Sequence, residues 1–378
     1  MTYQIVGGGI GGLCLALAFK KLGIPFHVYE RAPELREVGA GIWLAPNALQ
    51  ILAWLGILGN VQRAGNTIDR ITLADAQLNP LSDISQDTII DRFGYSTIAI
   101  HRASLQKLLF DAIPDQNKTL GKDLDHFQVT QDAVSLHFTD GTQHTGEYLI
   151  GADGIHSAVR KQLFPSRNTR HSGQLCWRGI ATLNLTEEFR QRGMELWGDR
   201  IRFGISQVAE NQVYWFAVSE QSAPLPQDPI LRKTALLTRY QAFHPLVGQV
   251  LEATPPQQIM ENAILDLDPK GAWYQGRVCL IGDAAHATTP NMGQGGAQAI
   301  EDAYFLSQLL LEHPGEAGFV IFVERRQKKV QFVVKQSWNT GKLAHWKRGQ
   351  GIRNRLMRSI PERILVKQML NLYRLDDF

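Results

Sequence analysis

The first thirty residues alternate between apolar runs and breaks that predict a strand, a helix and a second strand. Tyr3 to Val6 is an apolar run of strand length, and apolar residues then recur at helical spacing from Leu13 to Leu22. Gly23 is expected to end this helix, because glycine readily adopts the left-handed backbone found at helix ends. Pro25 to Tyr29 is the next expected strand. This order predicts the start of an α/β fold.

A second strand-to-helix passage lies near residue 280. Val278 to Ile281 predicts a buried strand, and apolar residues recur at helical spacing from Ala297 to Leu306. The stretch between them, Gly282 to Gly296, holds Asp283, Pro290 and several glycines. It predicts a helix start whose backbone N–H groups face a ligand. A tight connection that needs small residues for packing is the alternative.

The middle of the chain changes character and predicts a second lobe. Residues 171–275 contain apolar runs rich in aromatic residues, which predict an antiparallel sheet, and residues 68–97 alternate in a way that predicts more strands of that inserted sheet. Residues 297–311 and 316–345 are expected to be helical. Further helices are expected over Pro46–Leu58, His101–Leu109, Ala158–Leu163, Pro229–Phe243 and Pro245–Leu251.

The spacing Gly7-x-Gly9-x-x-Gly12 lies between the first expected strand and helix and matches the dinucleotide-binding fingerprint. One glycine makes the turn, one admits the pyrophosphate, and one lets helix and strand pack closely. Glu30 ends the second strand, where an acid bonds ribose hydroxyls and would repel a 2′-phosphate. This unit predicts binding of the adenosine diphosphate part of FAD or NAD.

Two further charged residues stand at element ends. Asp153 follows an expected strand and lies beside glycines, as Asp283 does, which suits a chain that returns to one sheet. Arg102 lies in the first turn of an expected helix, where the helix dipole disfavours a cation. It is therefore expected to have an anionic partner or to be a solvated surface charge. Gly39 to Gly41 either approaches a flat ligand or forms a flexible loop.

Composition excludes several classes of protein. The net charge of +3, without a basic-aromatic repeat, does not indicate nucleic-acid binding. The three cysteines, Cys14, Cys176 and Cys279, lack ligand spacing and predict buried free thiols, no metal site and a reducing, cytoplasmic location. No apolar run approaches the roughly 18 residues of a membrane span, and the N-terminus lacks the pattern of a signal peptide.

The end of the chain, Arg353 to Leu365, is basic and amphipathic. It is expected to pack on its own protein with a solvated cationic face. Peripheral contact with an anionic membrane surface is the alternative.

The glycine fingerprint with Glu30, the Asp153-Gly154 pair and the Gly282 to Gly296 stretch together resemble the single-component FAD-dependent aromatic hydroxylases, the family of p-hydroxybenzoate and salicylate hydroxylases. The resemblance covers essentially the whole chain. It implies an α/β fold: a Rossmann-like FAD-binding domain of the glutathione-reductase type, an inserted antiparallel-sheet substrate domain and a C-terminal helical region. The expected divisions are 1–70, 98–170 and 276–315 for FAD, 71–97 and 171–275 for substrate, and 316–378 for the helices.

The resemblance also implies non-covalent FAD and a set of residues that hold it. Gly9 and Gly12 would face the pyrophosphate and Glu30 the adenosine ribose. Asp153 would serve both FAD and the pyridine nucleotide, and Asp283 the ribityl hydroxyls. The remaining expected FAD residues are Arg31, Arg102 and Gln106 near the pyrophosphate and ribityl chain, and Gly293, Gly295 and Gly296 at the N1–O2 edge of the flavin ring.

The implied reaction is hydroxylation of a small aromatic or heteroaromatic substrate. NADH or NADPH would reduce FAD, and O2 would form a flavin C4a-hydroperoxide that transfers one oxygen atom. Arg200, Tyr214 and Pro290 are the expected catalytic residues, and Arg178 joins Arg200 and Tyr214 as a substrate contact. Each of the arginines and the tyrosine could instead be a sheet residue whose polar end reaches solvent.

Several alternatives stay open at the level of sequence. In the urate hydroxylase branch an aspartate that pairs with an arginine follows the proline, whereas this chain has Asn291, which argues against urate. An FAD-dependent epoxidase, another oxidoreductase on the same scaffold, or a non-catalytic redox sensor remains possible. The protein would be a monomer or a homodimer.

Overall fold

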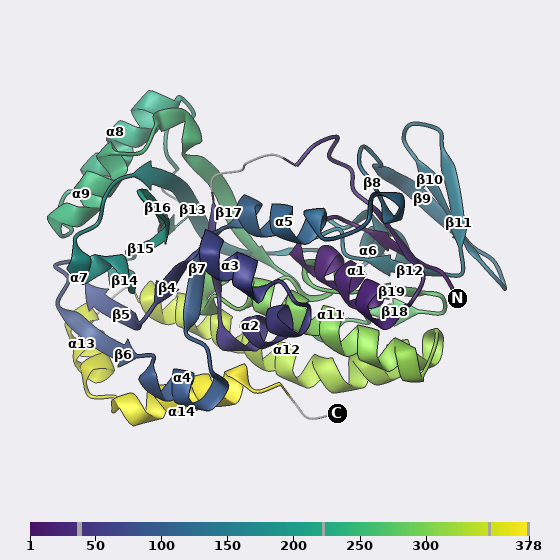
Figure 1. The fold of residues 1–378 in the computed structure, drawn as a ribbon. Helices are drawn as coiled ribbons and strands as arrows, with labels where there is room; N and C mark the ends of the chain where they lie inside the picture. Colours follow the sequence, from purple (N-terminus) through teal and green to yellow (C-terminus); the bar gives the residue numbers. More distant parts are fainter. Residues whose placement is uncertain (36–39, 221–223, 347–348, 376–378) are drawn as a thin grey trace.

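The structure is a computed structural model that describes residues 1–35, 40–220, 224–346 and 349–375. It shows a mixed α/β fold in which strands of four sheets are covered by helices (Figure 1). The helices and short 3-10 turns have the following bounds: α1 Ile10–Leu22, α2 Pro46–Trp54, α3 Leu58–Ala64, α4 Asp87–Phe93, α5 Arg102–Asp111, η1 Asp115–Asn117, α6 Ala158–Leu163, α7 Glu187–Arg190, α8 Pro229–Arg239, α9 Pro245–Glu252, η2 Pro256–Gln258, α10 Asp283–His286, η3 Pro290–Met292, α11 Gly295–Glu312, α12 Glu316–Ala344, α13 Gln350–Arg358 and α14 Glu362–Tyr373.

A six-stranded sheet, ordered β18-β19-β12-β1-β2-β8, forms the centre of the nucleotide-binding part. The five strands from β19 to β8 are parallel. Their carboxyl ends therefore meet at one edge, which is where ligands bind in open α/β sheets. The strands are β1 Tyr3–Val6, β2 Phe26–Tyr29, β8 Lys118–Thr119, β12 Tyr148–Gly151, β18 Tyr274–Gln275 and β19 Val278–Leu280.

A seven-stranded sheet, ordered β17-β13-β16-β15-β14-β5-β6, forms the other large layer. Neighbouring strands are antiparallel except for β14 and β5. One face packs against α8 and α9 around a core that includes Trp177, Phe203 and Trp215. The strands are β5 Arg70–Asp75, β6 Pro80–Ser85, β13 Arg170–Thr182, β14 Arg192–Trp197, β15 Ile201–Ala209, β16 Gln212–Glu220 and β17 Met260–Asp266.

Two small sheets complete the strand arrangement. The sheet β3-β7-β4 lies against β15 of the large sheet and so connects the two layers. The sheet β11-β10-β9 is a meander, and the hairpin between β10 and β11 turns at Asp140-Gly141. The strands are β3 Gly41–Leu44, β4 Asn66–Ile68, β7 Thr97–His101, β9 Leu124–Val129, β10 Val134–Phe138 and β11 Gln143–Gly146.

The structure corrects three predictions of local structure. Residues 87–93 form helix α4, not a strand, because only Ile89 of its two isoleucines is buried and Gly94 caps the helix with a φ of 78°. The helix expected over Pro46–Leu58 ends at Trp54, since Gly56 has a φ of 82°, and resumes as α3. Strands β14 and β17 were missed. The expected division into domains stays a prediction.

The long helix α12 runs along one side of the molecule, and α13 and α14 continue on the same side (Figure 1). The main core lies between the six-stranded sheet and helices α1, α5, α11 and α12. Among the described residues, none of the helices has the length and apolar character that crossing a membrane requires.

Candidate active site

The glycine fingerprint occupies the carboxyl edge of β1. Gly7 has a φ of 115°, and a Cβ at Gly12 would overlap the Gly7 carbonyl oxygen, so both positions require glycine. A Cβ at Gly9 would meet nothing within 4 Å. Gly12 therefore serves close packing of α1 on β1, whereas Gly9 leaves open space beside the helix start. This is the arrangement that admits a pyrophosphate.

Glu30 and Gln106 both bind backbone atoms of Gly8. The Gly8 N–H donates to Oε2 of Glu30 at 2.6 Å, and the Ala32 N–H donates to Oε1 at 2.9 Å. Nε2 of Gln106, on α5, donates to the Gly8 carbonyl at 2.6 Å. Two predicted cofactor residues from separate elements thus meet at one residue of the fingerprint.

The Asp153 turn follows β12 at the same edge. The Val159 N–H donates to Oδ2 of Asp153 at 3.1 Å, and Oδ1 is buried without a hydrogen-bond partner among the described residues. Burial raises the pKa of this carboxyl, although hydrogen bonds from Ser157 and the backbone act against the rise. Ser157 caps α6 by accepting from the Arg160 N–H.

Arg160 joins the Asp153 turn to the Asp283 turn. Its side chain is buried, and its guanidinium donates to the carbonyls of Ile155 and Ala284 at 2.5 and 3.0 Å. The two acidic turns, which are far apart in sequence, are therefore held together by one cation. Nothing in the spacing of the sequence indicated this residue.

Asp283 is exposed at this edge beside the start of α11. One carboxylate oxygen lies 4.0 Å from the position of a Cβ at Gly295. A Cβ at Gly296 would lie 2.6 Å from Cδ1 of Ile42, so β3 covers the first turn of α11. Gly293 has a φ of 61° and ends the short turn η3 just before this helix. The acid and the helix N-terminus form one continuous surface.

Tyr214 brings the large sheet to this surface. Its ring packs against Gly41 so closely that a Cβ there would overlap it, and Gly41 precedes the Ile42 that covers Gly296. Arg178 hydrogen-bonds to Tyr214 and donates to Asn262 Oδ1 at 2.9 Å. Burial raises the pKa of the Tyr214 hydroxyl, so this group is a hydrogen-bond donor and not a base. Gly39, the other glycine considered in this loop, lies outside the described residues.

The face of the large sheet around Tyr214 is mixed in polarity. Registers place Phe216 beside Arg178, and Met260 on the strand at the other side of Arg178. Gly204 lies opposite Phe216, and a Cβ there would overlap the Phe216 ring. Phe216 and Met260 are partly exposed. An apolar strip therefore adjoins the Tyr214–Arg178 pair.

Arg202 closes the other end of this face. It is 1% exposed, and its Nη1 donates to Glu195 Oε1 at 3.1 Å while its Nη2 donates to Oδ1 of Asn291. The Asn291 amide in turn donates to Thr289 Oγ1 at 3.0 Å and to the Ser337 carbonyl at 2.7 Å. Asn291 thus links the turn η3 to the large sheet and to α12.

A model of the family described as "FAD binding domain" matches residues 2–334. The chain belongs to this family. The aurachin C monooxygenase/isomerase of Stigmatella aurantiaca is 37% identical over 361 residues, which cover 95% of this chain and 94% of that protein. The 2-heptyl-3-hydroxy-4(1H)-quinolone synthase of Pseudomonas aeruginosa strain UCBPP-PA14 is 32% identical over 365 residues, covering 96% and 94%.

The solved structure of Klebsiella pneumoniae HpxO complexed with FAD and uric acid matches with a TM-score of 0.90 at 27% identity, covering 99% of this chain and 96% of that one. These relatives confirm the resemblance to FAD-dependent hydroxylases, the cofactor FAD and the enzyme class, an FAD-dependent monooxygenase. The open space at Gly9 and the exposed edge at Asp283 and α11 fit such a cofactor.

Arg200 is not brought into the site. It lies in the turn between β14 and β15 with a φ of 57°, forms ion pairs with Asp199 and Glu220, and is half exposed. Tyr214 pairs across the sheet with Ser206, which is six residues after Arg200 along the strand. At the rise of a β-strand this places Arg200 about 20 Å from Tyr214. Arg202 takes the position expected of Arg200. The alternation of the strand, which puts residues 202, 204 and 206 on one face, was the signal that could have found it.

The other predicted residues lie near the edge with less contact. Pro290 begins η3 and is exposed, immediately before Asn291. Arg102 is exposed one turn before Gln106 on α5, and its charge acts on the Tyr214 hydroxyl. Arg31 is exposed on the surface after Glu30. Of the predicted free thiols, Cys14 and Cys279 are buried, while Cys176 is only partly buried.

A buried charged network beneath α11 was not predicted. Arg326 of α12 forms ion pairs with Glu301 and Asp302, which are both fully buried. Asp302 also pairs with His286 at 2.5 Å and accepts from the Gly282 N–H at 2.9 Å. Burial opposes ionisation of Asp302, but His286 and Arg326 outweigh it and lower its pKa. The network anchors both ends of the Gly282 to Gly296 stretch, because Asn47 Nδ2 bridges Glu301 and Gln294.

Proposed function

We propose that this enzyme uses NADH or NADPH and O2 to hydroxylate a ring carbon of a neutral bicyclic heteroaromatic compound of the 4-quinolone type that carries an alkyl chain. The observation that carries the proposal is the Tyr214 hydroxyl beside Arg178, whose Nε is buried without a hydrogen-bond partner among the described residues, with an apolar strip next to them. The two near-full-length relatives support it, since one is named for the synthesis of a 2-heptyl-3-hydroxy-quinolone.

The residues at the sheet edge would hold FAD. Gly9 and Gly12 would lie at the pyrophosphate, Glu30 at the adenosine ribose and Asp283 at the ribityl chain, with the N–H groups of Gly295 and Gly296 at the ring. Bound FAD supplies the acceptance of a hydride from the nicotinamide and the activation of O2, one atom of which enters the substrate while the other leaves as water. Helix N–H donors favour negative charge at that place.

Tyr214 and Arg178 orient the ring of the substrate. The ring nitrogen of a 4-quinolone donates electron density to carbon 3, which is the nucleophilic carbon that an electrophilic oxygen attacks. Donors directed at the oxo oxygen would hold the ring in one orientation, with carbon 3 toward the cofactor. Because burial raises the pKa of Tyr214, the hydroxyl keeps its proton and remains a donor throughout.

The far end of the face favours an uncharged substrate. The charge of Arg202 is compensated by Glu195, and its second nitrogen is occupied by Asn291. A substrate carboxylate would have to displace these buried partners, which costs several kcal/mol. Phe216 and Met260 instead offer apolar contact to an alkyl chain.

A substrate panel tests this proposal. Purified protein that carries FAD is given NADH or NADPH, and consumption of the nicotinamide, hydroxylated product and hydrogen peroxide are measured together. We expect 2-alkyl-4(1H)-quinolones to give product in proportion to nicotinamide consumed, with faster turnover for longer chains, and salicylate and urate to give little. The proposal would be overturned if salicylate or urate coupled nicotinamide consumption to product as well as the quinolones do. It would also be overturned if every quinolone gave only hydrogen peroxide.

A further inference from the structure

The positive charge of the chain is concentrated in its C-terminal helices. Residues 325–367 hold 13 of the 39 Lys and Arg residues but only one of the 36 acidic residues. This segment therefore carries a net charge of +12, whereas the whole chain carries +3 and the remainder −9. Arg326 and Arg353 of this count are buried, so the asymmetry points to an anionic partner of the remaining, more accessible cations.

Exposed apolar side chains gather in the same helices. Exposed hydrophobic residues on a protein surface are normally scattered singly. Here six of the twelve large hydrophobic side chains that are exposed among the described residues fall between positions 332 and 364. They are Phe332, Leu343, Trp346, Ile352, Leu356 and Ile364.

Cations and apolar residues share the solvent-facing stripe of each helix. On α12 the exposed positions recur every three or four residues, and α13 and α14 each expose an apolar residue beside cations. Basic residues interleaved with exposed aliphatic and tryptophan side chains are typical of helices that lie in a membrane interface. The exposed residues are Lys328, Phe332, Lys335, Lys342 and Leu343 on α12, Ile352, Arg355 and Leu356 on α13, and Arg363, Ile364 and Lys367 on α14.

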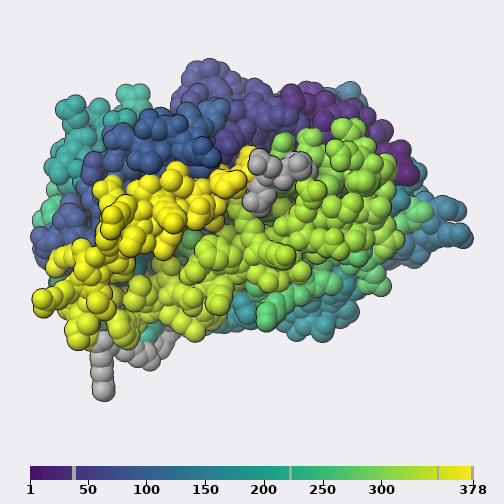
Figure 2. All heavy atoms as spheres, turned by 90° about the horizontal axis from the view of Figure 1, so that it is seen from below, coloured from purple at the N-terminus to yellow at the C-terminus, as the bar shows by residue number. Residues whose placement is uncertain are grey.

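The three helices form one face of the molecule. Figure 2 shows α12, α13 and α14 spread over the same side. Their opposite sides are fixed to the protein, since Val333 packs with Leu372 and Tyr373, and Lys329 donates to the Arg374 carbonyl at 2.7 Å. The inner sides of α12 and α14 are therefore packed on the rest of the protein.

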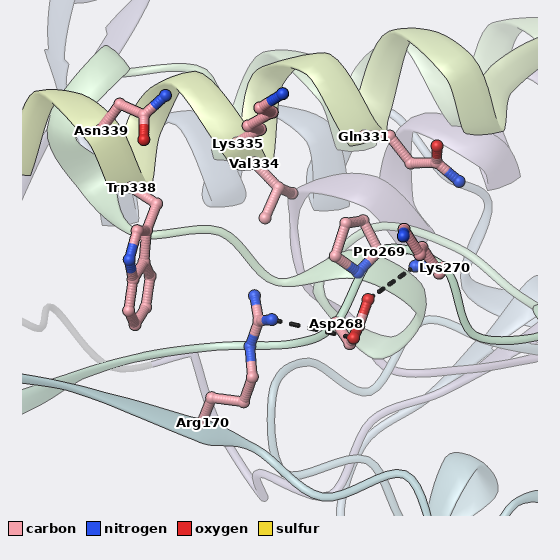
Figure 3. Close-up of a pocket in the computed structure, with 9 residues that line it drawn as sticks. All are labelled: Arg170, Asp268, Pro269, Lys270, Gln331, Val334, Lys335, Trp338 and Asn339. Atoms are coloured by element: carbon pink, nitrogen blue, oxygen red, sulfur yellow. Dashed lines mark hydrogen bonds and ion pairs between the residues drawn. The ribbon is translucent and has the colours of Figure 1, made fainter.

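A hollow of about 480 Å³ opens beside the stripe of α12 (Figure 3). Lys335 and Asn339 belong to both, and the Trp338 ring lies between the cations of Arg170 and Lys342. Three cations and one acid, Asp268, are among its lining residues. The hollow continues the basic and aromatic character of the plane into a recess of head-group size.

We propose that the face formed by α12, α13 and α14 docks on an anionic lipid bilayer. The cations would pair with lipid phosphates while the aliphatic and indole side chains enter the boundary of the acyl chains. Nucleic acid fits the cations but not the exposed aliphatic residues, and a second copy of this face would bring like charges together. A substrate with an alkyl chain partitions into lipid, so docking would bring the enzyme to the membrane that holds its substrate. This benefit rests on the proposed function, whereas the docking itself does not.

Vesicle flotation of the FAD-loaded protein tests the docking. The vesicles are pure phosphatidylcholine or contain about one third phosphatidylglycerol. We expect binding to the anionic vesicles alone, weakened at least about tenfold when NaCl rises from 0.1 to 0.5 M. The double variant Ile352→Glu/Leu356→Glu is expected to bind at least about tenfold more weakly. The matched control is Ile230→Glu/Leu231→Glu on α8, two residues that are 62% and 58% exposed, and it should bind as the parent does.

Retained FAD absorbance and an unchanged melting temperature show that each variant is folded. Absence of binding to anionic vesicles would overturn the proposal, as would equal loss in the control. Vesicle binding that survives Ile352→Glu/Leu356→Glu but is displaced by duplex DNA would also overturn it and assign the face to nucleic acid.

Discussion

At the scale of single residues, removal of the Tyr214 hydroxyl should affect the reaction of the substrate without affecting the binding of FAD. Its ring contacts Gly41 through carbon atoms, whereas its oxygen faces Arg178. Tyr214→Phe should therefore keep FAD bound and lower the rate of product formation by about 100-fold, the order of cost that follows when a contact that positions the substrate is lost. Steady-state product assays measure this change.

The control for that variant lies on the opposite face of the same sheet. The hydroxyl of Tyr240 donates to the carbonyls of Arg202 and Val218 at 3.3 and 3.2 Å. Tyr240→Phe removes the same atom from a buried site without touching the Tyr214 face. If it slowed turnover as much as Tyr214→Phe, the assignment of Tyr214 would be wrong.

Asn291 depends on the hydrogen bonds of its amide group as well as on its lack of charge. Asn291→Ala would remove the donor to the Ser337 carbonyl and the acceptor for Arg202, so buried polar groups on both sides would lose a partner. We expect the free energy of unfolding to fall by about 1–3 kcal/mol at pH 7. Urea denaturation measures it, and an unchanged or raised stability would contradict the role of the amide.

His345 gives the fold a dependence on pH. Burial, with the nearby charge of Arg202, lowers its pKa from 6.5 to about 4. Between pH 6.5 and 4 the histidine is protonated in the unfolded chain but not in the folded protein. The free energy of unfolding is therefore highest above pH 6.5 and decreases as the pH falls toward 4. Compared with His345→Asn, the parent should lose about 2–3 kcal/mol more between pH 7 and 4.5. Parallel urea titrations at the two pH values would reveal equal losses if the histidine were solvated.

At the scale of elements, Gly12 and Gly9 of the first turn have different roles: Gly12 allows close packing of α1 on β1, and Gly9 leaves space for the cofactor. Gly12→Ala would push α1 off β1, since the methyl overlaps the Gly7 carbonyl, and should lower the stability of the apoprotein by about 1–3 kcal/mol. Gly9→Ala has free space and an extended backbone, with φ of −77°. It should leave the apoprotein stable and weaken FAD binding at least about tenfold.

Titration of FAD into the apoproteins, with melting curves beside it, distinguishes the two variants. Gly248→Ala, in α9 and with nothing within 4 Å, is the control and should gain about 0.5–1 kcal/mol. Equal FAD affinity of Gly9→Ala and the parent would place the pyrophosphate elsewhere.

The joint between α11 and α12 depends on one cation. Arg326→Met would leave Glu301 and Asp302 buried with less compensating charge, which should cost about 3–5 kcal/mol. Lys328→Met, on the exposed side of the same helix, should be nearly neutral. Thermal unfolding of the two variants measures this difference, and similar losses would show that the pair is not what stabilises the joint.

Local patterns predicted the elements that carry their own signals. The turn at Gly7 to Gly12, the cap at Ser157 and the glycine end of α1 at Gly23 depend on neighbours in sequence, and the structure has them. Strand β14 pairs with β5, more than a hundred residues earlier in the chain, as well as with the adjacent β15. In the buried network Arg326 lies 24 residues after Asp302. No local pattern records partners at such separations. The position of Arg200 in the turn could not be foreseen, because the strand begins only one residue after it and nothing local distinguishes it from Arg202.

At the scale of the whole molecule, two layers contribute different halves of the site. The parallel sheet brings Gly7, Glu30, Asp153 and Gly282 to one edge, because each follows a parallel strand. The large sheet brings Tyr214 to that edge through its contact with Gly41. The cofactor residues were expected from motifs, and Tyr214 and Arg178 from the family resemblance. The positions of Phe216, Met260 and Arg202 beside them emerged only from strand register.

The central claim is that one atom of O2 enters a quinolone ring held by the Tyr214 face. The most direct measurement is product mass after turnover of a 2-alkyl-4(1H)-quinolone with NADH or NADPH under ¹⁸O2. We expect a product two mass units heavier than that formed under ordinary O2, and no such label from H2¹⁸O. Label from water, or nicotinamide oxidation that yields only peroxide, would contradict the account.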